Sequence, residues 1–239
     1  MYLIKFSYYG PAFESFTYIK GKNTVVGTIR EYLDRICENY VLKVSSRTDR
    51  NVSALSNAFG LICDRNINIL MKYLNTIKKP IFFHSYAEVQ DDFNPRHAKC
   101  RKYIYIYDKK LKIDEEIKNR ILELVGERDF SKFARKDNRN PVRKITEIKF
   151  HEMNKITVFE ITGESFLWNQ VRRMVGYIIY GKNDILMKSE NLILEDVCYD
   201  IIFNKFFPEN GNYDTFYLDF LVRRMIINYL EGRRGIEPL

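Results

Sequence analysis

The polar segment that follows the apolar stretch Val41–Ser45 has the composition of a catalytic turn. It carries Arg47, Thr48 and Asp49, and Arg50 comes next. We expect the apolar stretch to be a strand, and loops set on rigid strands are common places for catalytic groups. Positive charges close to Asp49 favour its ionised form, which can act as a nucleophile or a base. A polar turn with a surface ion pair explains the same residues, so both interpretations stay open.

The segment Arg101–Tyr107 alternates as a strand does. Alternate residues of a strand share a face, and one face here would carry Arg101, Tyr103, Tyr105 and Tyr107. The opposite face, with Ile104 and Ile106, is expected to belong to the core. Tyrosine rings can stack on bases and an arginine can bind phosphate, but tyrosines are also ordinary strand formers. The pattern fits an RNA-binding face and a half-buried sheet equally well.

The segment Phe166–Tyr180 has helical spacing. Five apolar residues form one stripe: Leu167, Val171, Met174, Val175 and Ile178. Arg172 lies off this stripe, and Gly176 follows one turn later, where the missing side chain lets another segment approach the helix. An arginine there could bind a carboxylate or a phosphate. A solvated helix face that carries an arginine is the commoner explanation of such a residue.

Composition limits the classes of partner. The 239 residues are 46% hydrophobic and 29% charged, which is typical of a globular chain. Lys and Arg number 39 against 31 Asp and Glu, which gives a net charge of +8. A basic balance favours a polyanionic partner, either nucleic acid or an anionic membrane. No apolar run approaches the ~20 residues that cross a bilayer, and the first residues do not resemble a signal peptide. We therefore expect a cytoplasmic protein that makes no membrane contact.

Cysteine and histidine are scattered along the chain: Cys37, Cys63, Cys100 and Cys198, with His84, His97 and His151. No pair has the spacing of metal ligands, and nothing indicates a disulfide framework. We expect reduced cysteines and no zinc site.

Strands and helices are expected to mix without a strict alternation, which favours an α+β fold with a largely antiparallel sheet. The expected strands are Met1–Tyr8, Val41–Ser45, Ala58–Asp64, Ile81–Val89, Arg101–Tyr107, Val142–Phe150, Lys155–Thr162 and Tyr213–Phe220. The expected helices are Thr24–Asn39, Ile67–Ile77, Glu115–Val125, Phe166–Tyr180, Leu192–Phe203 and Val222–Glu231.

Four segments, taken in order, resemble the TruA-type tRNA pseudouridine synthases. They are the turn Ser46–Ala54, the loop and strand Phe93–Tyr105, the element Gly126–Phe133 and the helix start Phe166–Gly176. The match covers most of the chain. It departs from the family at Ser46, Arg50, Asn51 and Ser53, where Gly, Ala, Gly and His are usual, and these departures bear on the choice of substrate.

The resemblance implies two related α+β halves, residues 1–110 with the Asp49 loop and residues 111–239 with the Arg172 helix. Their sheets would join into one extended, mainly antiparallel sheet with flanking helices and a central cleft. It also implies a homodimer that isomerises uridine to pseudouridine in tRNA, in the anticodon stem-loop at positions 38–40. Neither a metal nor an organic cofactor is implied.

The same resemblance assigns roles to individual residues. Asp49 would attack the uridine at the sugar C1′ or at ring C6, and Arg172 would pair with the Asp49 carboxylate. Tyr103 would pack against the target base, and Arg47 would hold the flipped nucleotide, since a stacked uridine is out of reach. We also expect RNA contacts from three arginines: Arg50, Arg96 and Arg101.

Two alternatives stay open. A non-catalytic RNA-binding protein could use the tyrosine strand and the basic surface, but it would not need Asp49. A nucleoside hydrolase would usually show paired carboxylates or a metal cluster, and the sequence indicates neither.

Overall fold

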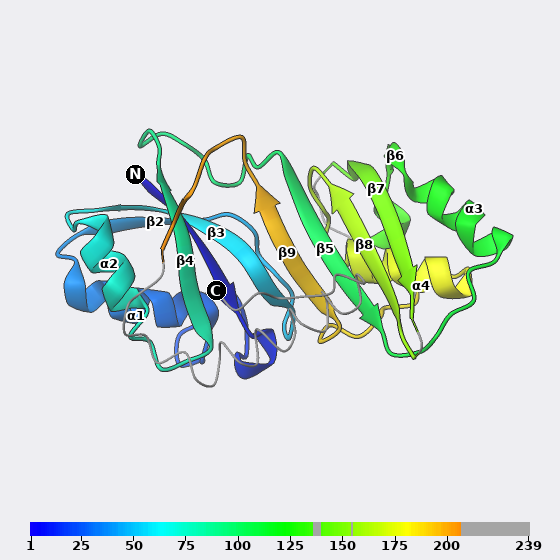
Figure 1. Cartoon of the computed structure of the whole chain (residues 1–239), viewed down its shortest axis with the longest axis horizontal. Helices are drawn as coiled ribbons and strands as arrows, with labels where there is room; N and C mark the ends of the chain where they lie inside the picture. The colour runs from blue at the N-terminus through cyan, green and yellow to red at the C-terminus, as the bar shows by residue number, and fades with distance from the viewer. Residues whose placement is uncertain (136–139, 154, 207–239) are drawn as a thin grey trace.

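A single large sheet organises the chain in the computed structural model, which describes residues 1–135, 140–153 and 155–206 (Figure 1). The order of the strands is β10-β4-β1-β3-β9-β5-β8-β7-β6, and β2 pairs with β3 beside this path. Within the described ranges β3 and β9 are the one parallel pair, and the other pairs are antiparallel. The fold is therefore α+β with an extended, mainly antiparallel sheet, as the sequence predicted.

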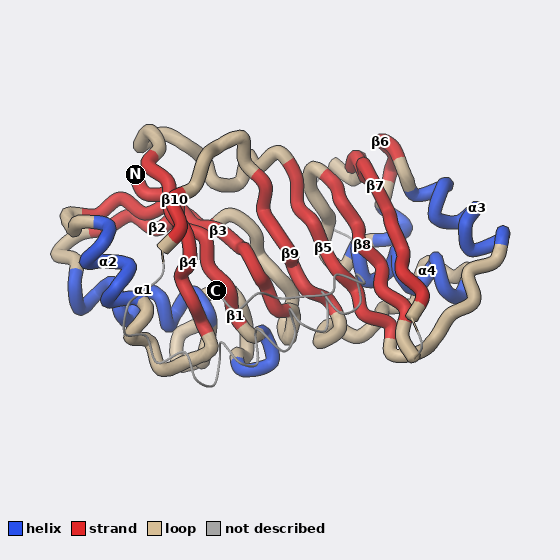
Figure 2. Tube along the Cα trace, viewed as in Figure 1, coloured by secondary structure: helices blue, strands red, loops and turns tan. Residues whose placement is uncertain are grey.

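The strands are β1 Tyr2–Tyr8, β2 Tyr40–Val44, β3 Ser53–Cys63, β4 Ile81–Glu88, β5 Cys100–Tyr107, β6 Gly126–Asp129, β7 Val142–Glu152, β8 Thr157–Gly163, β9 Leu192–Cys198 and β10 Asn204–Lys205. The α-helices are α1 Val25–Ile36, α2 Ile67–Leu74, α3 Glu115–Leu124 and α4 Gln170–Tyr180, and Gly10–Ala12 and Ser131–Phe133 form short 3₁₀ helices. Figure 2 shows α1 and α2 at one end of the sheet and α3 and α4 at the other.

Helices α1, α2 and α3 begin where a capping side chain satisfies a free N–H group of the first turn, whereas α4 has no side-chain cap. The Thr24 hydroxyl accepts from the Gly27 N–H at the start of α1, and the Asp114 carboxylate accepts from the Ile117 N–H at the start of α3. In α4 the predicted apolar stripe is buried. Each helix thus places one apolar face against the sheet.

The tyrosine face of β5 belongs to the main core. Tyr103, Tyr105 and Tyr107 are buried in the same apolar cluster as residues of all four described helices. Ile104 packs on the opposite face in a separate small cluster with Val158 and Ile193. The expectation that the isoleucine face belongs to the core is confirmed for Ile104, which is 1% exposed, but the larger core lies on the tyrosine face, which the helices cover.

Within the segment predicted as a helix, Leu192–Phe203, residues Leu192–Cys198 instead form strand β9, and the rest is irregular. Strand β9 pairs with β3 on one side and β5 on the other, so it joins the two ends of the sheet. Its first three residues are all buried. Pairing on both edges outweighs the weak local preference of this short apolar run, which fits a helix or a strand equally well.

Cys100 and Cys198 form a disulfide that links β5 to β9. This corrects the expectation of four unpaired cysteines, of which Cys37 and Cys63 remain free. The two bridged residues are 98 positions apart and become neighbours only because β5 and β9 pair at this register. Once β9 is taken for a helix, the sequence offers no signal for the bridge.

The division of the chain at residue 110 stays a prediction. Strand β5 precedes that boundary, yet it pairs with β8 and β9, which both follow it. The strand and helix predicted beyond residue 212 lie outside the described residues. In the described part of the chain, no helix is long and apolar enough to span a membrane.

Candidate active site

The loop between β2 and β3 carries Asp49 and is fixed along its length. The Ser45 hydroxyl donates to the Pro95 carbonyl oxygen at 2.6 Å, and the Asn57 amide donates to the Ser46 carbonyl oxygen at 2.9 Å. The hydroxyls of Tyr8 and Thr48 lie 2.7 Å apart. These bonds hold the turn to the strands around it, so the Asp49 carboxylate projects from a rigid base.

The turn ends in a tight approach of two backbones. Asn51 has a φ of 67°, a left-handed conformation that asparagine adopts more readily than most residues. Gly10 packs against Val52, and a Cβ at Gly10 would lie 2.2 Å from the Val52 carbonyl oxygen. Only glycine fits there, because any side chain would push the end of the Asp49 loop away from the Gly10–Ala12 3₁₀ helix.

Asp49 meets Arg172, which lies in the first turn of α4. The Arg172 guanidinium lies 3.2 Å from the Asp49 carboxylate, and both side chains are largely buried, with exposed fractions of 13% and 20%. Arg172 Nε also donates to the Met187 carbonyl oxygen at 2.6 Å, and Arg172 Nη1 lies 3.4 Å from Asn169 Oδ1. The Arg172 side chain is therefore held by residues on either side of it in the sequence, Asn169 before it and Met187 in the loop after α4.

Gly176 makes that arrangement possible. A Cβ at this position would lie 2.5 Å from the Ile185 carbonyl oxygen. The loop after α4 therefore runs directly against the helix and brings the Met187 carbonyl within reach of Arg172. The close approach predicted for Gly176 is confirmed.

Tyr103 forms one wall of the site and is 9% exposed. Its ring packs edge-on against Phe166, with the centroids 5.2 Å apart. Burial raises the pKa of Tyr103 to about 12, with a smaller upward effect from Asp49 and a lowering effect from Arg101. The phenol is therefore neutral at ordinary pH and presents a ring and a hydroxyl rather than a charge.

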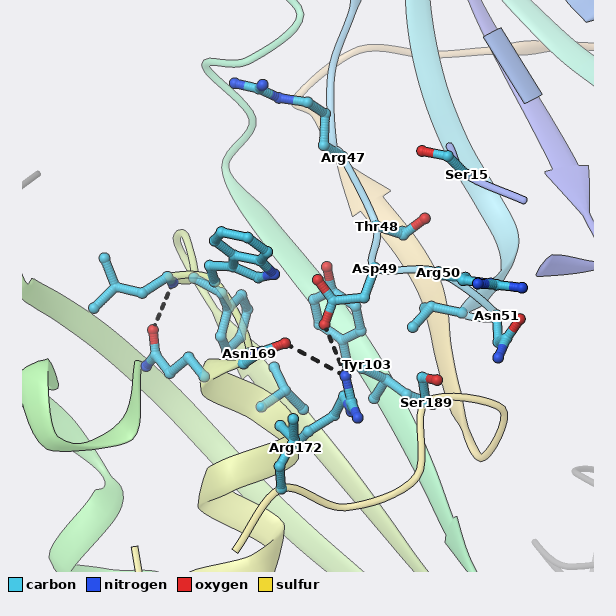
Figure 3. Close-up of a pocket in the computed structure, with 18 of the residues that line it drawn as sticks. Ser15, Arg47, Thr48, Asp49, Arg50, Asn51, Tyr103, Asn169, Arg172 and Ser189 are labelled. Carbon is cyan, nitrogen blue, oxygen red and sulfur yellow. Dashed lines mark hydrogen bonds and ion pairs between the residues drawn. The ribbon is translucent and has the colours of Figure 1, made fainter. Parts of the chain in front are cut away.

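These groups line one cavity of about 840 Å³ (Figure 3). Small-molecule sites usually occupy ~300–1,000 Å³, so the space suffices for a nucleotide. In Figure 3 Asp49 points toward Tyr103 and Arg172, whereas the side chains of Arg47 and Arg50 point away from it. Both of these arginines line the cavity and are exposed, but the cation in contact with Asp49 is Arg172.

Arg101 lies elsewhere than expected. It is 9% exposed, and its guanidinium donates to the Ser46 hydroxyl at 3.0 Å, to the Arg96 carbonyl oxygen at 2.7 Å and to the Glu164 carbonyl oxygen. Burial lowers its pKa. The side chain ties the Asp49 loop to the segment before α4 and does not face solvent, whereas Arg96 is exposed.

Two residues of the site were not singled out from the sequence: Tyr8, which supports Thr48, and Trp168, which lines the cavity. Asn169, which the helical spacing places off the apolar stripe together with Arg172, contacts that arginine. Of the two missed residues, only Trp168 lies close enough to Arg172 in the sequence for the pattern there to indicate it. Among the described residues, no three His, Cys, Asp or Glu side chains are grouped so that they could hold a metal ion.

Comparison with known proteins gives concordant matches. A model of the tRNA pseudouridine synthase family matches residues 121–191, which include Arg172. The tRNA pseudouridine synthase A of Picrophilus torridus is 36% identical over 209 residues, which cover 84% of this chain and 82% of that protein. The protein of the same name from Thermoplasma volcanium is 36% identical over 210 residues, covering 83% and 85%.

Among solved structures, a Cbf5-Nop10-Gar1 complex contains a chain with 14% identity and a TM-score of 0.41, covering 71% of this chain and 43% of that one. The membership rests on the sequence relatives, which align over more than four-fifths of their own length. This chain belongs to the tRNA pseudouridine synthase A family of isomerases.

Proposed function

We propose that this chain isomerises uridine to pseudouridine in tRNA, in the anticodon stem-loop at positions 38–40. One observation supports it most. A carboxylate and an arginine from segments 123 residues apart meet inside a cavity that also holds a buried tyrosine. An ordinary surface ion pair on a polar turn would not require the two close backbone approaches that Gly10 and Gly176 permit. The position within tRNA rests on the family resemblance.

Asp49 is the proposed nucleophile. In one route its carboxylate oxygen bonds to C1′ as the bond from C1′ to N1 breaks, and the uracil leaves as an anion. The base turns, C5 bonds to C1′ as the bond to Asp49 breaks, and the proton on C5 is lost while N1 gains one. In the other route Asp49 bonds to ring C6 as the electron pair of the C5=C6 bond moves toward the C4 carbonyl, and the bond from C1′ to N1 then breaks. The base turns, C5 bonds to C1′, N1 gains a proton, and loss of the C5 proton restores the C5=C6 bond and releases Asp49. Both routes conserve all atoms and need no oxidant, metal or organic cofactor.

The surrounding residues have positioning roles in this proposal. Arg172 holds the Asp49 carboxylate in one orientation, which favours a direct attack. Tyr103 offers a ring to the target base, and Arg47 is exposed beside the cavity, where it can hold the extruded nucleotide. Extrusion is required because the reacting atoms of a stacked uridine are inaccessible.

RNA contacts are also proposed for Arg50, which lines the cavity, and for Arg96, which lies outside it; both side chains are exposed. For Arg101 we now propose a positioning role, because its donors are already bound inside the protein. A homodimer and a cytoplasmic location also belong to the proposal and rest on the resemblance.

The test uses the purified chain and unmodified tRNA transcripts. Tritium release from uridine labelled at C5 reports turnover, and mapping of pseudouridine in the product identifies the position. We expect conversion at one or more of positions 38–40. Conversion elsewhere would correct the position, and tight binding without any conversion would favour the non-catalytic RNA-binding protein.

A further inference from the structure

Trp168 is the chain's single tryptophan, and its side chain is unusually open. It is 45% exposed, lines the cavity beside Asp49 and lies two residues before the start of α4. Large aromatic side chains are normally buried or placed at interfaces. Its neighbour Leu167 is buried, so the exposure belongs to this side chain and not to the whole segment.

The backbone of Trp168 is held firmly. The Leu167 N–H donates to the side-chain oxygen of the fully buried Gln170 at 2.8 Å, and Asn169 adopts a left-handed conformation with a φ of 67°. On the other side, the Arg135 N–H donates to the Trp168 carbonyl oxygen at 3.0 Å. The indole is therefore presented at the cavity by a segment that is tied both to α4 and to Arg135, which follows the 3₁₀ helix Ser131–Phe133.

Arg135 packs on the indole, and no described residue pairs with its charge. Its guanidinium carbon lies 4.3 Å from the indole centroid, which is close enough for a cation–π contact. The side chain is exposed, and within the part of the chain that the structure describes its guanidinium makes no hydrogen bond or ion pair. A stacked guanidinium leaves its N–H donors at the edge of the plane, where a phosphate can bind.

Another stacked arginine shows the contrast. Arg35 lies 5.2 Å from the Tyr32 ring centroid on α1, but its guanidinium is paired with Glu31 at 2.6 Å. That arrangement satisfies both the charge and the ring within one helix. The Arg135 pair has no such acidic partner among the described residues, so an anion from outside can neutralise it.

We propose that Trp168 and Arg135 bind the nucleotide next to the target uridine, and this inference rests on the proposed function. Extruding a uridine removes the stacking partner of its neighbour. The exposed indole can replace that partner, because stacking on an aromatic ring is tolerant of sequence. The Arg135 guanidinium then binds the adjoining phosphate. Together, Trp168 and Arg135 offset part of the free-energy cost of extruding the uridine and orient the RNA strand beside Asp49.

The experiment exploits the single tryptophan. The Asp49→Asn variant is titrated with unmodified tRNA, and indole emission is recorded beside a filter-binding titration of the same samples. We expect quenching that saturates with the filter-binding affinity. Trp168→Leu, assayed by filter binding, should bind about 5-fold to about 100-fold more weakly. The tRNA affinity of Trp168→Phe should lie between those of Trp168→Leu and the native chain. This variant keeps an aromatic ring, so it serves as a control for a folding defect in the leucine variant.

Charge variants test the phosphate contact. Arg135→Gln should reduce the slope of log affinity against log salt by about 0.7–0.9, the value for one phosphate. Arg35→Gln is the matched control, since it also removes a stacked guanidinium, and its slope should equal that of the native chain.

Each outcome decides the matter. tRNA binding with unchanged emission, or with native affinity in Trp168→Leu, overturns this inference and leaves the proposed function standing. If the salt slope of Arg135→Gln equals that of Arg35→Gln, Arg135 makes no phosphate contact. If the native chain binds tRNA and quenches but forms no pseudouridine, the stacking unit stands and the proposed activity falls. Absence of tRNA binding overturns both.

Discussion

Arg172 and Asp49 lie 123 residues apart in the chain, and their side chains meet at 3.2 Å. The same guanidinium donates through Nε to the Met187 carbonyl oxygen at 2.6 Å. The loop that supplies this carbonyl reaches the helix because Gly176 has no side chain. The orientation of the carboxylate is thus set by α4 and its following loop as well as by the Asp49 turn.

Arg172→Lys should lower turnover about 10-fold to about 100-fold, although the charge is kept. A planar guanidinium can bind Asp49 and the Met187 carbonyl oxygen together, whereas an ammonium cannot hold both in this geometry. Losing a charged hydrogen bond costs ~1.5–3 kcal/mol. Steady-state tritium release measures the effect. The matched control is Arg173→Lys, the next residue of α4, whose guanidinium contacts the Asn183 carbonyl oxygen at 3.4 Å. Equal rates for the two variants would show that Arg172 is an ordinary helix residue.

Asp49→Asn should abolish pseudouridine formation and leave tRNA binding close to native. The change is nearly isosteric, so the bonds that fix the loop at Ser45, Ser46 and Thr48 should persist. An amide is far too weak a nucleophile to replace the carboxylate. Tritium release and filter binding on the same preparation separate the two effects. Native turnover would exclude Asp49 as the catalyst, and loss of folding would show that it is a structural turn residue.

Local patterns in the sequence predicted much of the site. The apolar stripe of α4 follows from helical spacing alone. A glycine within a helix, here Gly176, indicates that another segment can approach the helix closely. The turn before β3 was visible because polar residues follow an apolar strand. These features depend on neighbours in the chain, so a single sequence reveals them.

The errors all arise from contacts between distant segments. Strand β9 is specified by pairing with β3 and β5, and the disulfide exists only once that pairing exists. Arg101 was assigned to the RNA surface because alternation predicts a face but not what covers it. Three acceptors surround its guanidinium, and two of them, the Ser46 hydroxyl and the Glu164 carbonyl oxygen, belong to segments 55 and 63 positions away.

Binding to tRNA should weaken steeply as salt rises. The net charge of +8 and the exposed Arg47, Arg50 and Arg96 favour contacts with phosphate, and each contact that forms releases counterions. The measurement is filter binding over a salt series. A flat response would exclude an extended basic surface for tRNA.

Tyr103→Phe should change how stability depends on pH in the alkaline range. Burial raises the pKa of Tyr103 to about 12 in the folded chain, above the ordinary tyrosine value of 10.0. The unfolded phenol therefore loses its proton first, so the contribution of Tyr103 to stability is complete below pH ~10 and falls as pH rises toward ~12. A shift of this size corresponds to ~3 kcal/mol. Urea unfolding at several pH values should show the native chain losing more stability than Tyr103→Phe above pH ~10. Parallel curves would mean that the tyrosine ionises equally in both states.

Arg101→Met should destabilise the fold and slow turnover without changing the salt slope of tRNA binding. The buried guanidinium donates to Ser46, Arg96 and Glu164, and methionine would leave those three acceptors unpaired. Unsatisfied buried polar groups cost ~1–3 kcal/mol each at most sites, so the free energy of unfolding should fall by at least about 2 kcal/mol in urea. Turnover should fall because the Asp49 loop and the segment before α4 lose their common anchor.

The salt series distinguishes this role from the RNA contact expected from the sequence. Arg96→Gln is the matched comparison, because Arg96 is exposed and, among the described residues, its guanidinium has no hydrogen bond or ion pair that would keep it from phosphate. We expect Arg96→Gln to lower the salt slope with little loss of stability. Arg101→Met should lower the stability and leave the salt slope unchanged. Since an internal guanidinium releases no counterions on binding, a lowered slope in Arg101→Met at native stability would place Arg101 on the RNA after all.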